Sequence, residues 1–102
     1  MKTPGAEDLA GVFKALSDPN RLAILQLIRE HCGTGRRLSP EDEGRNVSAI
    51  AKEFDLSLST VSHHLKELKH AGLIRCVKRG QWVFCSVNEK ALEAIRTFAG
   101  VR

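Results

Sequence analysis

With 102 residues and no run of eighteen apolar residues, the chain has the length of one domain, 1–102, and lacks a segment that could span a membrane. That length leaves no room for a cofactor-binding fold beside a separate catalytic domain. The net charge is +4. The whole excess lies in residues 57–80, where five basic residues accompany one acid, and such a local basic segment favours a polyanionic partner.

The amino end and the cysteines indicate the compartment. The sequence MKTPGAEDLA contains two early acids and no apolar core of a secretion signal, so we expect a cytoplasmic protein with no membrane partner. The chain has three cysteines, Cys32, Cys76 and Cys85. An odd number without an export signal argues against an obligatory disulfide framework, so we expect reduced thiols.

Two helices are predicted before residue 33, separated by the helix-stop sequence Ser17-Asp18-Pro19. Ser17 or Asp18 can cap the second helix, and Pro19 suits its first turn. The second helix is apolar around most of its circumference, so we expect it to be buried. The apolar positions are Leu9, Val12, Phe13 and Leu16 in the first helix and Leu22, Ile24, Leu25, Leu27 and Ile28 in the second.

Residues 33–45 combine glycine, proline and mixed charge without periodicity, which predicts a loop with a tendency to disorder. A short helix begins at Val47 and ends at Asp55. Its apolar face is formed by Ile50, Ala51 and Phe54.

Ser57 can cap a longer helix over 58–71, which Gly72 ends. Two β-rich runs, 73–77 and 81–87, then flank Lys78-Arg79-Gly80, a pattern that predicts a hairpin with a basic tip. A last helix over 89–99 follows. The apolar stripes of these two helices are Val61, Leu65 and Leu68, and Leu92, Ile95 and Phe98.

This order of elements predicts a mainly α fold with a small β-hairpin, a winged helix-turn-helix. The helix over 58–71 must enter the major groove of DNA while its apolar side stays docked on the helix before it. Small hydroxylated residues at its start let the backbone approach base edges, and the basic hairpin suits phosphates. The residues expected at DNA are Leu58, Ser59, Thr60, Ser62, His63 and Lys66 on the helix and Lys78, Arg79 and Gln81 in the hairpin.

Three strings also carry a family resemblance: FKALSDPNRLAILQLI, LSLSTVSHHLKELKHAGLI and RGQWVFCSV. Together they resemble the ArsR family of bacterial winged-helix repressors over nearly the whole chain except the loop at 33–45. The resemblance implies a homodimer that binds a palindromic operator in double-stranded DNA and is released by a small effector. The effectors implied are metals, metalloids and thiol-reactive signals.

The resemblance also implies that the first and last helices form the dimer. Two terminal amphipathic helices present more apolar surface than one small core needs, which favours the same arrangement. The expected interface residues are Leu9, Val12, Phe13, Leu16, Leu92, Ile95 and Phe98.

The sequence departs from the family at the effector sites and in the turn. Asn46, Val47 and Ser48 stand where arsenite-responsive members have a Cys-Val-Cys triplet, and the last helix has no histidine for a zinc site. Asp55 replaces the usual glycine of the turn, and aspartate tolerates a left-handed backbone better than most residues.

A thiol site is the remaining effector hypothesis, with a trivalent metalloid or an oxidant acting at the cysteines. Cys76 and Cys85 are directly opposed if the hairpin is centred on Gly80-Gln81 and offset if it is centred on Arg79-Gly80, and the sequence leaves both registers open. Cys32 could add a third ligand. The competing interpretation is that the cysteines are small buried hydrophobes.

Other interpretations of the chain have less support. His63 and His64 as a metal pair are disfavoured because adjacent helical residues point about 100° apart. A winged helix that binds an acidic protein instead of DNA remains the alternative function. An enzyme is not expected, because no nucleophile, base and orienting group occur at motif spacing.

Overall fold

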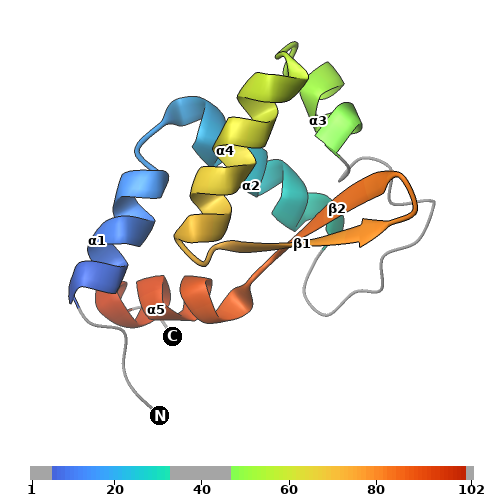
Figure 1. Ribbon diagram of the computed structural model, residues 1–102. Coiled ribbons are helices and arrows are strands. Elements are labelled where there is room, and N and C mark those ends of the chain that lie inside the picture. The colour runs from blue at the N-terminus through green and yellow to red at the C-terminus, as the bar shows by residue number, and fades with distance from the viewer. Residues whose placement is uncertain (1–5, 33–46, 101–102) are drawn as a thin grey trace.

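A computed structural model describes residues 6–32 and 47–100 (Figure 1). In these ranges the chain forms five helices and one two-stranded antiparallel sheet, and no helix is long and apolar enough to cross a bilayer. The predicted loop at 33–45 lies outside the described residues. The elements are α1 (Ala6–Ala15), α2 (Pro19–Cys32), α3 (Val47–Glu53), α4 (Leu58–His70), β1 (Ile74–Arg79), β2 (Trp82–Val87) and α5 (Glu89–Ala99).

The break between α1 and α2 follows from local hydrogen bonding. The Ser17 hydroxyl donates to the Lys14 carbonyl at 2.7 Å, which ends the α1 turn. The Asp18 carboxylate accepts the Arg21 backbone N–H at 3.0 Å, so Asp18 caps α2 directly before Pro19. Of the two predicted caps, the structure uses Asp18 for α2.

One apolar core joins the helices α1, α2, α3 and α4 to the hairpin. The predicted apolar faces supply most of it, and the structure differs from the predictions at Val12 and Leu22. Val12 is only 5% exposed, because α1 turns it into the core. Contrary to the prediction, almost none of its side chain is therefore left for a dimer interface. Leu22 is 40% exposed, so α2 is not buried around its whole predicted apolar surface. The core residues are Val12, Ala15, Ile24, Leu25, Ile28, Ile50, Ala51, Val61, Leu65, Leu68, Leu73, Ile74, Cys85 and Val87.

The turn between α3 and α4 has the backbone that the sequence predicts. Asp55 has φ 52°, a left-handed conformation, and the Leu56 N–H bonds to the Ala51 carbonyl at 2.9 Å. Ser57 then caps α4, accepting the Thr60 N–H at 3.1 Å. These bonds fix the angle at which α4 leaves α3.

The hairpin is centred on Gly80-Gln81, with Arg79 paired to Trp82. Gly80 supplies the positive φ of 60° that a tight hairpin turn requires. Lys78 and Arg79 therefore belong to strand β1, whereas the sequence placed them in the turn. The shift of the turn by one residue decides the cysteine register, and it puts Cys76 opposite Cys85.

Asn88 connects the hairpin to α5. Its side chain accepts the Lys90 N–H at 3.2 Å as the helix cap and donates to the Gly72 carbonyl at 2.8 Å. Although α5 has a marked apolar stripe, none of its residues is buried. It lies beside α1 in Figure 1, while the hairpin extends away from this pair of helices.

Candidate nucleic-acid interface

The amino end of α4 is organised by a cluster of hydroxyl groups. Ser57 Oγ donates to Thr60 Oγ1 at 2.8 Å and lies 3.1 Å from Ser59 Oγ. Since the single proton of Ser57 is used by Thr60, Ser59 is the donor in the second contact. The Thr60 proton and lone pairs of Ser59 then remain at the surface, where they suit the mixed donors and acceptors of base edges.

One side of α4 is exposed and polar, and the other is buried and apolar. Val61, Leu65 and Leu68 lie in the core, so they fix the helix on α2 and α3. Leu58 is 55% exposed, so its side chain is accessible from solvent on this side of the helix. All the α4 residues that the sequence assigned to DNA are exposed: Leu58, Ser59, Thr60, Ser62, His63 and Lys66.

The two adjacent histidines have different environments. His63 is exposed, whereas His64 is 7% exposed and its Nδ1 accepts the Arg21 Nε proton at 3.4 Å. Their ring centroids are 6.0 Å apart with the planes tilted by 50°. Within residues 6–32 and 47–100, no group of three or more His, Cys, Asp or Glu side chains could hold a metal ion.

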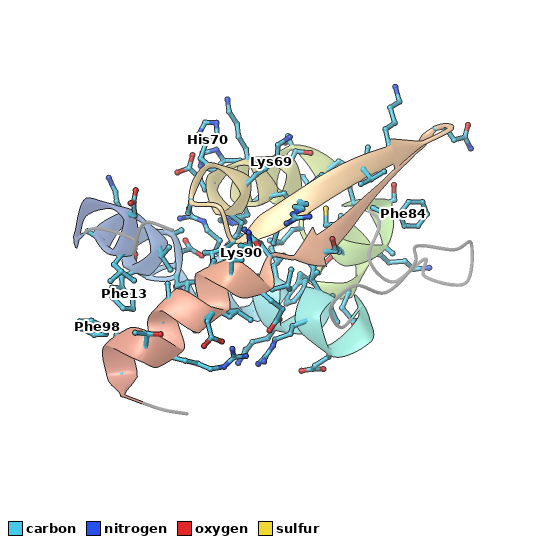
Figure 2. All side chains as sticks on the ribbon, turned by 90° about the horizontal axis from the view of Figure 1, so that it is seen from below. Phe13, Lys69, His70, Phe84, Lys90 and Phe98 are labelled. Carbon is cyan, nitrogen blue, oxygen red and sulfur yellow. The ribbon has the colours of Figure 1, made fainter. Side chains whose placement is uncertain are left out.

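Basic side chains continue from α4 onto the hairpin. Lys78 and Gln81 are exposed, while the side chain of Arg79 lies outside the described residues. Lys69 and Arg75 are also exposed and were absent from the sequence-based list. Lys69 follows Lys66 by three residues, so the 3.6-residue period puts the two side chains on neighbouring positions of one helix face. This spacing could have identified Lys69 from the sequence. In Figure 2, Lys69 stands on the side of α4 away from α2.

Cys76 and Cys85 face each other across the two strands of the hairpin. Their Sγ atoms are 3.1 Å apart, and both are reduced thiols. The hydrogen bond with Cys85 lowers the pKa of the Cys76 thiol to about 7, helped by the positive charge of Lys69 and opposed by burial. The Cys32 side chain lies outside the described residues, so its proximity to this pair is not part of the structure.

The terminal helices present an aromatic pair at the opposite end from the hairpin tip (Figure 2). Phe13 is 40% exposed and Phe98 is 67% exposed, and their ring centroids lie 5.4 Å apart in an edge-to-face arrangement. Apart from the buried Val12, the remaining predicted interface residues are half-buried: Leu9, Leu16, Leu92 and Ile95.

Comparison with known proteins places this architecture in a family. Residues 16–77 match the family model described as a helix-turn-helix domain. The transcriptional repressor SdpR of Bacillus subtilis is 37% identical over 82 residues, which are 80% of this chain and 78% of SdpR.

Two solved structures share the whole fold. The crystal structure of the ArsR family transcriptional regulator RHA00566 superposes with a TM-score of 0.73 at 28% identity, covering 97% of this chain and 90% of that one. The solution structure of Mb0332 from Mycobacterium bovis, described as a homodimeric winged helix-turn-helix DNA-binding domain and possible ArsR-family regulator, gives 0.69 at 25% identity, with 98% and 89% covered. The chain therefore belongs to the helix-turn-helix domain family and, within it, to the ArsR family of winged helix-turn-helix transcriptional regulators.

Proposed function

We propose that this chain is a homodimeric transcriptional repressor that acts in the cytoplasm by binding a palindromic operator. The observation that carries the proposal is α4 itself. Its buried face is locked onto α2 and α3, while its opposite face presents hydroxyl, imidazole and ammonium groups to solvent. A helix held rigidly from behind with such a surface suits direct readout in the major groove.

The exposed groups divide into two roles. Ser59, Thr60, Ser62 and His63 provide short donors and acceptors for base edges, and Leu58 provides an apolar surface for a thymine methyl group. Contacts to phosphates, which set register and carry no sequence information directly, fall to the longer side chains. These are Lys66 on α4 and Lys78, Arg79 and Gln81 in the hairpin.

Two protomers are needed to read a palindrome, and α1 with α5 supplies the surface to join them. The exposed rings of Phe13 and Phe98 lie on this surface, flanked by the half-buried Leu9, Leu16, Leu92 and Ile95. A twofold dimer through this face buries each patch against its copy. The family member Mb0332, described as homodimeric, supports this arrangement.

Repression of this kind is relieved when a small effector lowers the DNA affinity. The Cys76–Cys85 pair lies in the hairpin to which we assign phosphate contacts, since β1 carries both Cys76 and Lys78. A trivalent metalloid or an oxidant at these thiols is the class of effector we propose.

The test starts by selecting duplexes from a random pool with the wild-type protein, followed by binding measurements on a selected duplex and a scrambled one. Ser59→Ala and His63→Ala should each cost about 1–3 kcal/mol on the selected duplex and little on the scrambled one. Lys78→Ala should weaken both equally and lower the salt slope by about one. Lys90→Ala, at an exposed position of α5, is the control and should change neither the affinity for the two duplexes nor the salt slope.

Two results would contradict the proposal. If Ser59→Ala loses equal binding free energy on both duplexes, α4 does not read the bases. A protein that enriches no duplex and binds none at low salt would favour the alternative function, a winged helix that binds an acidic protein.

A further inference from the structure

The cysteine pair in the hairpin is arranged for bond formation between its sulfurs. Cys76 and Cys85 occupy directly opposed positions of β1 and β2, with their Sγ atoms 3.1 Å apart. A disulfide has an S–S bond of about 2.05 Å and joins Cα atoms about 4.4–6.8 Å apart, a span that opposed strand residues satisfy. The sulfurs therefore need to approach by only about 1 Å, within reach of small side-chain rotations.

The two thiols have unequal environments that assign different chemical roles. Cys85 is completely buried in the core, whereas Cys76 is half-buried and open to small reagents. The hydrogen bond with Cys85 lowers the pKa of Cys76 to about 7, which favours its thiolate form relative to an ordinary cysteine. Cys76 is thus the sulfur that a solvent-borne oxidant meets first, and Cys85 is the thiol held beside it to complete the bond.

We propose that Cys76 and Cys85 form a reversible dithiol–disulfide site within the wing hairpin, oxidised by hydroperoxides. This inference rests on the proposed function and narrows its effector at these thiols to an oxidant; its test reads the thiols directly, so its failure is distinguishable from a failure of DNA binding.

The chemistry balances in two steps. The Cys76 thiolate attacks one oxygen of the hydroperoxide, the O–O bond breaks, and the products are a Cys76 sulfenic acid and, after protonation, water or an alcohol. The Cys85 sulfur then attacks the Cys76 sulfur, forming the S–S bond and releasing hydroxide, which leaves as water with the Cys85 proton. Two electrons pass from the thiols to the peroxide, and a small dithiol returns the pair to its reduced form.

The same sulfurs suit a metal or metalloid less well. A tetrahedral metal ion needs four ligands and trivalent arsenic is best held by more than two sulfurs. Among the described residues no third His, Cys, Asp or Glu joins the pair. Oxidation needs only the two atoms that the hairpin already brings together.

The experiment uses the full chain carrying Cys32→Ser, so that only the hairpin thiols remain, treated with hydrogen peroxide at pH 7. The intact mass should fall by about 2 Da, and dithiothreitol should restore it. Trypsin cleaves after Arg75, Lys78, Arg79 and Lys90, so the digest should contain residues 76–78 joined to 80–90 by a disulfide.

Two matched variants separate the roles of the sulfurs. With Cys85→Ala added, Cys76 should stop at the sulfenic acid and be trapped by dimedone. With Cys76→Ser added, Cys85 should react at least about tenfold more slowly, because it is buried and raised thiol pKa values accompany apolar burial.

Specific outcomes would overturn the proposal. These are a mass that rises by oxygen atoms with no loss of hydrogens in the two-thiol protein, a disulfide that joins two chains instead of residues 76 and 85, and equal reactivity of the two single-thiol variants. Binding of phenylarsine oxide by a two-thiol protein that peroxide does not convert to the disulfide would overturn it too, and would assign the pair to metalloids.

Discussion

Arg21 of α2 donates its Nε proton to Nδ1 of His64, the buried polar side chain on the inner face of α4, at 3.4 Å. The same guanidinium donates through Nη1 to the Ala15 carbonyl at the end of α1, at 3.2 Å. One side chain thus connects α1, α2 and α4. Because Nδ1 accepts, the neutral ring carries its proton on Nε2.

Arg21→Ala should therefore destabilise the protein by about 1–3 kcal/mol, because it leaves a buried ring nitrogen and a helix-end carbonyl without their donors. The free energy of unfolding in urea measures this. Arg29→Ala, at an exposed position of the same helix, is the matched control. Equal losses for the two variants would show that the bond to His64, which is long for a hydrogen bond, contributes nothing.

The free energy of unfolding should fall at acid pH because the Asp18 carboxylate becomes protonated. The Arg21 backbone N–H holds the pKa of the Asp18 carboxyl below its ordinary value of 3.8, so the folded state prefers the carboxylate. This contribution is complete above the unfolded pKa and is lost as pH falls through the lower folded pKa. Asp18→Asn keeps a cap acceptor without the charge, so its thermal midpoint should fall less than that of the parent between about pH 5 and pH 2. Identical slopes for both proteins would contradict this.

The turns and caps were predictable because short segments determine them. Asp55 adopts the left-handed backbone that aspartate tolerates, and Ser57 caps α4 as its position before an apolar period predicts. The family resemblance gave the same order of elements. The residues expected on the exposed face of α4 are exposed, because the helical period fixes the opposite face from the core residues alone.

Properties that depend on non-local pairing were less predictable. The hairpin register depends on which two residues form the turn, and the sequence offered both Arg79-Gly80 and Gly80-Gln81. The burial of Val12 beside the exposed Phe13 depends on how α1 docks, which periodicity does not fix. His64 is a polar residue, so the sequence gives no sign that it is buried. Its hydrogen bond with Arg21 on another helix explains its burial.

Phe98→Glu should weaken self-association through α1 and α5. Phe98 is 67% exposed in the protomer, so it has apolar area left to bury against a second copy. Burying a phenylalanine contributes about 1.5–3 kcal/mol, and a twofold interface counts it twice. Sedimentation should show a dimer for the parent and a larger monomer fraction for the variant. Thr97→Glu is the control, because it adds the same charge at the neighbouring exposed position and should affect the dimer less. A parent protein that is monomeric at tens of micromolar, roughly the range of a moderate interface, would refute this prediction.

Oxidation of the wing should lower the affinity for operator DNA. Closing the Cys76–Cys85 bond rotates the two cysteine side chains and cross-links β1 to β2 two residues before Lys78, which we expect to shift the basic hairpin tip. Loss of one phosphate contact should reduce the salt slope of binding by about one. The measurement compares binding of the selected duplex by reduced and peroxide-treated protein, both with Cys32→Ser. Protein with Cys76→Ser and Cys85→Ser should bind equally before and after peroxide. If the disulfide forms and the parent still binds DNA with unchanged affinity and slope, the pair is a redox site without a regulatory effect, and the effector acts elsewhere.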